Sequence, residues 1–451
     1  MRALLQTAAD YAISYLGGLE ARSVAPTPEA VDRLKVFREP LPDGPTDPAI
    51  VLRLLDEYAS PATMAMAGPR FFGFVVGGSL PSALAANWLT GAWDQNSGLY
   101  RVTPATALLE HVALGWLLEI FGLPAACGGS FVTGATVANF TALAAARHAV
   151  LAGVGWDVEA NGLCGAPPIT VVAGEEAHPT LLKSLGLLGL GRKRPVRVPV
   201  DSQGRMRPDA LPPLPKPSIV CVQAGNVNTG AFDPIREISE RVHATEGWVH
   251  VDGAFGLWAR AAPSRAHLAA GVEDADSWAT DAHKWLNVPY DSGLAFVRDA
   301  HTLQAAMAVT AEYLPTASEE RNPSDYTPEL SRRARGVEVW AALRSLGRSG
   351  LSDLIERTCR HARRFANGLT AAGHEVLNEV ALNQVLVSFH DPDTTLRVIA
   401  DLQAEGTCWC GSTVWQGRTA MRISVSSWAT TDTDVERSLD AILRIATKHR
   451  R

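Results

Sequence analysis

The sequence predicts an α/β protein with a mainly parallel central sheet, followed by a smaller α+β domain. Short apolar runs alternate with helical stretches between residues 131 and 297, which is typical of parallel sheets covered by helices. After Pro328 two long helical patterns precede two strand-like runs, which indicates a separate α+β domain. We therefore expect an N-terminal helical segment, a large domain and a small C-terminal domain, at residues 1–65, 66–330 and 331–451.

The expected strands of the large domain are short and apolar, as strands buried on both faces are. They cover residues 131–132, 169–172, 196–200, 219–222, 248–251, 277–280 and 294–297. Helices are expected between them at 138–151, 181–190 and 233–245. Pro234 suits the first turn of the last of these helices, because that turn needs no backbone N–H donor.

Both ends of the chain are predicted to be helical. Apolar residues from Leu4 to Leu16 recur at helical spacing, and the apolar face of such a helix needs a partner, for example another subunit. Thr433 is the predicted cap of the last helix. The other expected elements near the ends are helices at 49–58, 328–346, 351–371, 395–403 and 435–446, and strands at 385–389 and 421–425.

The composition is that of an ordinary globular enzyme. Of 451 residues, 47% are hydrophobic and 20% charged, and the net charge of −6 argues against the basic surface of a nucleic-acid-binding protein. No stretch reaches the roughly 18 apolar residues of a membrane helix, and no signal-peptide pattern follows the first helix. The six scattered cysteines lack metal-ligand spacing. We expect a cytoplasmic protein with reduced thiols and no metal, nucleic-acid or membrane partner.

Lys284 is the most informative residue of the chain. An isolated lysine is usually a solvated surface charge, but Lys284 stands between His283 and Trp285 shortly after a predicted strand. Ligands of parallel α/β sheets bind beyond the carboxyl ends of the strands. A lysine in a partly dry site can act as a nucleophile toward an aldehyde. Lys284 is therefore a candidate for covalent cofactor binding.

Two further side chains follow predicted strands. Asp252 precedes Gly253 and Ala254, and it either caps a turn or pairs with the ring nitrogen of a flat cofactor lying against these small residues. His178 either caps a helix or stacks on that ring. An amine, a carboxylate and a flat side chain together are what pyridoxal 5'-phosphate (PLP) requires. The combination with Lys284 predicts PLP as cofactor and a small-molecule amino acid as substrate.

A glycine-rich segment supplies a candidate phosphate site. Gly134, Ala135 and Thr136 lie between a predicted strand and a predicted helix. Backbone N–H groups at a helix N-terminus bind phosphate well, although many helices begin with such residues for structural reasons alone. The position of this segment ahead of His178, Asp252 and Lys284 in the chain favours the phosphate interpretation.

These residues match a known family. The chain resembles the group II PLP-dependent amino-acid decarboxylases, which include aromatic-L-amino-acid, tyrosine, histidine and glutamate decarboxylases. The resemblance extends from about Pro69 into the C-terminal domain. It rests on residues 134–139, His178, 250–254, 283–285 and 331–335. It implies fold type I, the aspartate-aminotransferase fold, and a homodimer with active sites at the subunit interface.

The resemblance also assigns roles. By position, Lys284 resembles the Schiff-base lysine, Asp252 the partner of the pyridine nitrogen, and His178 the stacking residue, with Ala254 under the ring. Tyr313 resembles the mobile-loop tyrosine that protonates Cα after CO₂ has left, although the loop from residue 313 to 332 is shorter than in animal relatives.

The phosphate neighbourhood is implied in the same way. It comprises Gly134, Ala135, Thr136, Asp281 and His283. Asn is frequent in the family where Asp281 stands, so rearranged phosphate contacts are expected.

We expect α-decarboxylation of an L-amino acid to the amine and CO₂, with Tyr313 or Lys284 as the proton donor. Aldehyde synthase, aldolase and aminotransferase activities use the same cofactor and stay open. A non-catalytic homologue is disfavoured because Lys284 and Asp252 are both present. For the substrate side chain, Arg101 favours an acidic group, unless it only forms a surface or interface salt bridge, whereas Phe72 and Trp93 favour an aromatic one.

Overall fold

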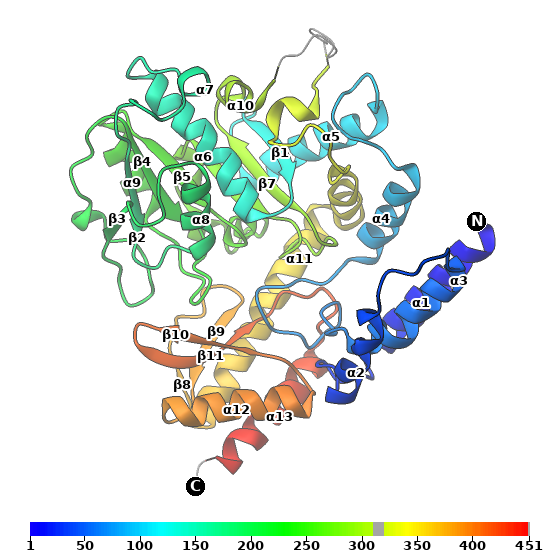
Figure 1. The fold of residues 1–451 in the computed structure, drawn as a ribbon. Helices are drawn as coiled ribbons and strands as arrows, with labels where there is room; N and C mark the ends of the chain where they lie inside the picture. Colours follow the sequence, from blue (N-terminus) through cyan, green and yellow to red (C-terminus); the bar gives the residue numbers. More distant parts are fainter. Residues whose placement is uncertain (310–319, 450–451) are drawn as a thin grey trace. The chain divides into compact units, whose positions relative to one another are not determined.

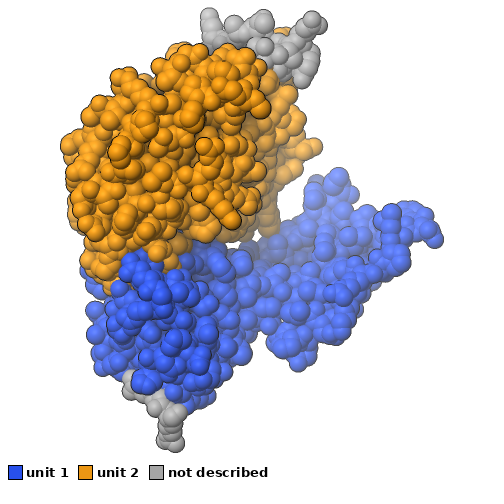
Figure 2. Space-filling view, turned by 60° about the vertical axis from the view of Figure 1, so that its left-hand side comes forward, with its two compact units in different colours: residues 1–78, 361–377, 385–451 blue, residues 79–360, 378–384 orange. Residues whose placement is uncertain are grey.

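The computed structural model describes residues 1–309 and 320–449 (Figure 1). The chain forms two compact units, which Figure 2 colours separately. Unit 1 comprises Met1–Gly78, His361–Leu377 and Val385–Arg451, and unit 2 comprises Ser79–Arg360 and Asn378–Gln384. The units group the first 78 residues with the C-terminal ones. The predicted division into three parts at residues 65 and 330 stays a prediction.

Unit 2 is built on a seven-stranded sheet with the order β1-β7-β6-β5-β4-β2-β3. Strands β3, β2, β4, β5 and β6 pair in parallel, whereas β7 is antiparallel to both of its neighbours, β6 and β1. The predicted mainly parallel α/β fold is confirmed. The strands are β1 (Gly128–Val132), β2 (Thr170–Gly174), β3 (Val196–Val198), β4 (Ser218–Gln223), β5 (Trp248–Asp252), β6 (Ser277–Asp281) and β7 (Gly293–Val297).

Helix α6 (Ala135–Ala152) covers the centre of this sheet and contacts β5, β6 and β7. Its buried alanines, among them Ala138 and Ala142, pack against Ala279 and Ala295 of the strands. Small side chains on both surfaces let the helix lie close to the sheet. The other helices of this part are α4 (Pro81–Trp93), α5 (Pro104–Phe121), α7 (Val158–Asn161), α8 (Pro179–Leu187), α9 (Ile235–His243) and α10 (Ala300–Met307).

Helix α5 has the length and hydropathy of a membrane span, alone among the helices of the described chain. It is also a core helix of unit 2, because Ala113, Leu117 and Phe121 are fully buried there. Its buried Glu110 pairs with Arg321 and Arg332. An apolar helix that carries such a buried ion pair fits the interior of a folded domain.

The helix predicted at 328–346 begins later than expected. Helix α11 spans Gly336–Ala371, with Gly347 in a non-helical conformation inside it (φ 61°, ψ −177°). The backbone of Arg332 bonds instead to a preceding loop: its N–H donates to Asn96 Oδ1, and its C=O accepts from the N–H of Ser97. These bonds replace helical ones, so residues 328–335 are not part of the helix.

Unit 1 contains most of a four-stranded sheet with the order β10-β11-β9-β8. Thr433 was predicted to cap the last helix of this unit, but the prediction was wrong, because the cap is Thr431. The Thr431 hydroxyl accepts from the N–H of Asp434, and the Asp434 carboxylate accepts from the N–H of Thr431, which forms a capping box. The elements are β8 (Glu375–Val376), β9 (Gln384–Ser388), β10 (Gly411–Trp415), β11 (Arg418–Ser424), α12 (Pro392–Glu405) and α13 (Asp432–Lys448).

The N-terminal residues form the two predicted helices and an additional short one, α2, without burying them. Helices α1 (Arg2–Gly18), α2 (Pro28–Arg33) and α3 (Pro48–Leu54) contain no buried residue, and α3 continues into a π-helical turn at Leu55–Ala59. On α1, Leu5 and Ile13 are each 60% exposed. A single chain therefore leaves the apolar face of α1 uncovered.

Candidate active site

The predicted chemical residues gather at one edge of the large sheet. Asp252 is the last residue of β5 and Asp281 the last residue of β6, and Lys284 follows three residues later. His178 follows β2, and Ala135 begins α6 directly after β1. All four strands run in the same direction, since β1 is antiparallel to the antiparallel strand β7. The carboxyl ends of such strands share an edge, where ligands of parallel α/β sheets bind.

The amine of Lys284 is held inside this edge. Its Nζ lies 2.9 Å from Oδ2 of Asp281, and the Lys284 side chain is only 19% exposed. The alternative of a solvated surface lysine therefore does not describe this residue. A half-buried amine paired with one carboxylate is suited to react with a carbonyl group once the amine has lost a proton.

Asp252 is a buried carboxylate that accepts a hydrogen bond from the N–H of Ala254 at 3.3 Å. Burial raises its pKa above the usual value, while attraction to His178 and Lys284 opposes the rise. Ionised Asp252 is therefore short of positive charge in this structure. A protonated ring nitrogen would supply that charge, so the carboxylate fits a pyridine cofactor.

His178 is the N-cap of α8, so the helix-capping interpretation is correct as far as it goes. Its Nδ1 accepts from the N–H of Thr180 at 3.3 Å and lies 2.6 Å from the Thr180 hydroxyl. These contacts fix the plane of the imidazole, which a stacking residue also requires. The contact with Thr180 was not predicted, although a hydroxyl two residues after a predicted helix cap often bonds to the capping side chain.

His283 is oriented by two neighbours that the sequence did not identify. Its Nδ1 accepts from the N–H of Ser292 at 3.2 Å. Its ring stacks on Tyr290, with centroids 4.3 Å apart and 28° between the planes. Burial lowers the pKa of His283, and nearby Asp281 opposes this shift. Partial burial of its phenol, followed by repulsion from Asp281, raises the pKa of Tyr290 to about 12, although the residue as a whole is 56% exposed.

The glycine-rich segment forms the start of α6, with Gly134 as its N-cap. The N–H of Ala135 donates to Oδ1 of Asp281 at 2.6 Å. The backbone C=O of half-buried Thr136 accepts from the hydroxyl of Ser184 at 2.7 Å, which ties this turn to α8. A helix N-terminus that already binds one anionic oxygen provides the donors and the dipole that a phosphate needs.

A buried chain of hydrogen bonds supports the site from below. Trp248 Nε1 donates to Ser277 Oγ at 2.9 Å, and Ser277 Oγ lies 2.9 Å from Nδ1 of His250. His250 Nε2 lies 2.8 Å from Oδ1 of Asn139 on α6. Burial lowers the pKa of His250 to about 3, so its imidazole is neutral. The chain fixes α6 against β5 two residues before Asp252.

Of the three predicted substrate residues, one lies in unit 1 and two lie in unit 2. Phe72 is a core residue of unit 1, packed edge-on against Phe365 with ring centroids 5.2 Å apart. Trp93 ends α4 and is 43% exposed. Arg101 is exposed and forms no ion pair within residues 1–309 and 320–449. Tyr313, the predicted proton donor, lies outside the described residues.

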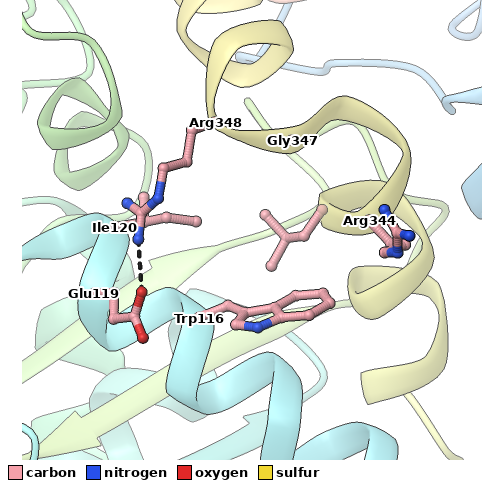
Figure 3. Close-up of a pocket in the computed structure, with 7 residues that line it drawn as sticks. Trp116, Glu119, Ile120, Arg344, Gly347 and Arg348 are labelled. Carbon is pink, nitrogen blue, oxygen red and sulfur yellow. Dashed lines mark hydrogen bonds and ion pairs between the residues drawn. The ribbon is translucent and has the colours of Figure 1, made fainter.

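A pocket of about 260 Å³ lies between α5 and α11 (Figure 3), and none of the residues with predicted chemistry lines it. Trp116 forms one wall, and Arg348 pairs across it with Glu119 at 2.6 Å. The pocket contains neither a lysine nor a histidine. Among the described residues, no group of three His, Cys, Asp or Glu side chains is arranged to hold a metal ion.

Comparisons with known proteins identify the family. Residues 42–390 match the family model described as the pyridoxal-dependent decarboxylase conserved domain. An aromatic-L-amino-acid decarboxylase of Bacillus atrophaeus is 27% identical over 79% of this chain and 74% of its own length. An L-2,4-diaminobutyrate decarboxylase of Rhizobium meliloti is 29% identical over 90% of this chain and 83% of its own length.

The fold is also similar to a solved structure. The crystal structure of Oryza sativa TDC with PLP and tryptamine superimposes with a TM-score of 0.91. It is 24% identical in sequence, and the match covers 99% of this chain and 97% of that one. This likeness concerns the fold, and it covers nearly the whole chain.

Proposed function

Because the chain belongs to the pyridoxal-dependent decarboxylase family, we propose that it removes the α-carboxylate of an L-amino acid and releases the amine and CO₂. The family assignment makes the protein a PLP-dependent carboxy-lyase. PLP, when bound, withdraws electrons from Cα of the attached amino acid and so weakens the bond to the carboxylate. The observation that carries the proposal is the half-buried Lys284 amine at the same sheet edge as Asp252.

The residues at this edge have the donors and charges that PLP requires. In this proposal Lys284 holds the aldehyde carbon, Asp252 holds the ring nitrogen, and His178 stacks on the ring with Ala254 beneath it. The buried Asp252 carboxylate, held by the N–H of Ala254, supports the fit. Ionised Asp252 keeps the ring nitrogen protonated, and this charge is what makes the ring an electron acceptor.

The phosphate is assigned to the start of α6. Gly134, Ala135, Thr136 and His283 surround the helix N-terminus, and Asp281 lies against it. The helix fixes the direction of the backbone N–H groups at this N-terminus, so they favour one orientation of the cofactor. Stacking on Tyr290 holds the His283 ring toward the same place.

The remaining step is return of a proton to Cα. The Lys284 amine becomes free when substrate takes its place, and Asp281 at 2.9 Å stabilises its protonated form. Lys284 is therefore a suitable donor. Tyr313 is the second candidate, through its resemblance to the family tyrosine. A Tyr313→Phe variant that accumulates aldehyde product in place of amine would assign the proton to Tyr313.

We also propose a homodimer in the cytoplasm. Both units expose large apolar side chains, such as Ile13 in unit 1 and Leu89 and Val102 in unit 2, each at least 55% exposed. Exposed apolar groups of this kind are typical of an interface between subunits. Arg101 adjoins Val102, which supports a role for Arg101 at a shared active site. None of the six cysteines forms a disulfide bond within the described residues, which supports a reducing compartment.

The decisive experiment is an assay of CO₂ and amine. Purified enzyme is incubated with PLP and a panel of L-amino acids with aromatic, acidic and basic side chains. We expect one class to yield equimolar CO₂ and amine, and borohydride reduction to leave a pyridoxyl group on Lys284 by mass spectrometry. Lys284→Ala abolishes both signals, while Lys183→Ala, an exposed lysine on α8, leaves them intact. Aldehyde with ammonia, or no product from any amino acid, would contradict the proposal.

A further inference from the structure

Asp281 occupies the place that the proposed function gives to the cofactor. Its side chain is 3% exposed and contacts three groups at once. Oδ1 accepts from the N–H of Ala135 at 2.6 Å and lies 3.6 Å from Nε2 of His283, and Oδ2 lies 2.9 Å from Nζ of Lys284. The first two groups are those assigned to the phosphate, and the third is the amine assigned to the aldehyde.

The sheet order brings Asp281 to this position. Strand β7 lies between β1 and β6, and its first residue, Gly293, is paired with both Val132 and Asp281. A Cβ on Gly293 would lie 2.4 Å from Cα of Gly134, so only glycine lets the backbone before α6 come this close. The Asp281 carboxylate can therefore reach across β7 to the N-terminus of α6.

We propose that Asp281 is an internal anion that satisfies the N-terminus of α6 in the cofactor-free protein, and that PLP must displace this carboxylate from the N–H of Ala135 to bind. The inference rests on the proposed function. A carboxylate next to an incoming phosphate repels it, and Asp281 loses the cationic partner at 2.9 Å once the Lys284 amine is engaged. Asp281 therefore stabilises the start of α6 and weakens binding of the phosphate-bearing cofactor.

Asp281→Asn tests this idea, because the amide keeps the size of the side chain and removes its charge. The dissociation constant of PLP is measured on apoenzyme by absorbance titration, beside that of pyridoxal, which lacks the phosphate. We expect the variant to bind PLP about tenfold more tightly, a change that corresponds to about 1.4 kcal/mol. Pyridoxal affinity should change much less. The melting temperature of the apoenzyme should fall, because the ion pair with Lys284 is lost.

Asp299→Asn is the matched control. Asp299 is an exposed N-cap whose carboxylate accepts from the N–H groups of His301 and Thr302 at the start of α10. The control substitution should lower the stability of apoenzyme and holoenzyme alike and leave PLP affinity unchanged. Should Asp281→Asn fail to fold, Asp281→Ser removes the same charge with a smaller side chain and carries the same expectation.

Two results overturn the inference alone. One is tight PLP binding by the wild-type enzyme with equal or weaker binding by the Asp281 variants. The other is an equal gain for PLP and pyridoxal, which would mean that Asp281 acts on the Lys284 amine and not on the phosphate. Wild-type apoenzyme that binds no PLP at all would instead overturn the proposed function, and this inference with it.

Discussion

Glu110 and Arg332 form an ion pair in which neither side chain is more than 1% exposed, with 2.7 Å between Oε2 and Nη1. Glu110 also pairs with Arg321 at 3.2 Å. Arg332 donates in addition to the C=O groups of Ser97 and Phe131, so one guanidinium connects α5, β1 and the segment before α11. The ion pair therefore holds these segments of unit 2 together.

Glu110→Gln should destabilise the protein strongly. The substitution leaves two arginines, one of them fully buried, with a neutral acceptor, and breaking a buried pair in this way costs about 3 kcal/mol or more. The free energy of unfolding from urea denaturation of the apoenzyme measures the effect. Glu119→Gln, which breaks the exposed pair with Arg348, is the control and should cost less than about 1 kcal/mol. Equal costs would show that burial of the Glu110 pair is unimportant.

His250 should make stability depend on pH. Its folded pKa is about 3, well below the value of 6.5 for a free imidazole. Neutral His250 contributes fully to the free energy of unfolding above pH 6.5. This contribution is lost as the pH falls toward 3, because the unfolded chain binds a proton on His250 before the folded chain does. The loss is about 1.4 kcal/mol per pH unit in that range.

Comparison with His250→Asn isolates this effect. The variant should unfold at lower urea concentration at pH 7, and the difference from wild type should shrink as the pH is lowered from 6.5 to 4.5. His267→Asn, which replaces a histidine outside the hydrogen-bonded chain, should show no such convergence. A difference that stays constant with pH would mean that His250 is protonated in the folded protein.

The strand ends that hold the chemistry could be predicted from sequence. Asp252 and Lys284 follow short apolar runs, and in a parallel sheet such positions meet at one edge regardless of the exact strand order. The contact between Asp281 and Ala135 could not be predicted, because it depends on β7 lying between β1 and β6 and on the close approach at Gly293. Pairing of distant segments is not encoded in local periodicity.

Two other features were missed for local reasons. The Tyr290–His283 stack arises because the chain turns back between these residues, and hydrophobic spacing does not reveal such turns. The start of α11 was placed too early, because residues 328–335 have helical composition while Arg332 bonds to Asn96 and Ser97. In this segment tertiary hydrogen bonds outweigh helix propensity.

Asp252→Asn should separate stability from activity. Because burial raises the pKa of Asp252, its ionised form costs stability in the apoenzyme as the pH rises above the unfolded value, and the amide removes that cost. We expect the variant apoenzyme to melt at a higher temperature at pH 7, while kcat falls by about a thousandfold or more because the ring nitrogen loses its anionic partner. A variant that is both active and unaltered in melting temperature would refute the assignment.

Ile13→Asp should dissociate the proposed dimer. Ile13 is 60% exposed on α1, so the substitution costs little in a single chain, whereas a buried carboxylate at a subunit interface costs several kcal/mol. Sedimentation velocity should change from one dimeric species to a monomer. Ser14→Asp, a substitution at the neighbouring polar position on α1, is the control and should leave the dimer intact. A monomeric wild-type protein would contradict the proposal directly.

Arg101→Ala should distinguish the two substrate classes. A guanidinium that pairs with a substrate carboxylate contributes about 1.5–3 kcal/mol, so its loss should raise KM for an acidic amino acid by about tenfold or more. KM for an aromatic amino acid should change little, since an aromatic ring makes no ion pair with this residue. Trp93→Ala is the matched variant and should show the reverse preference. Steady-state kinetics with one acidic and one aromatic substrate measures both, and equal changes in KM for Arg101→Ala would leave Arg101 with a structural role at the surface or interface.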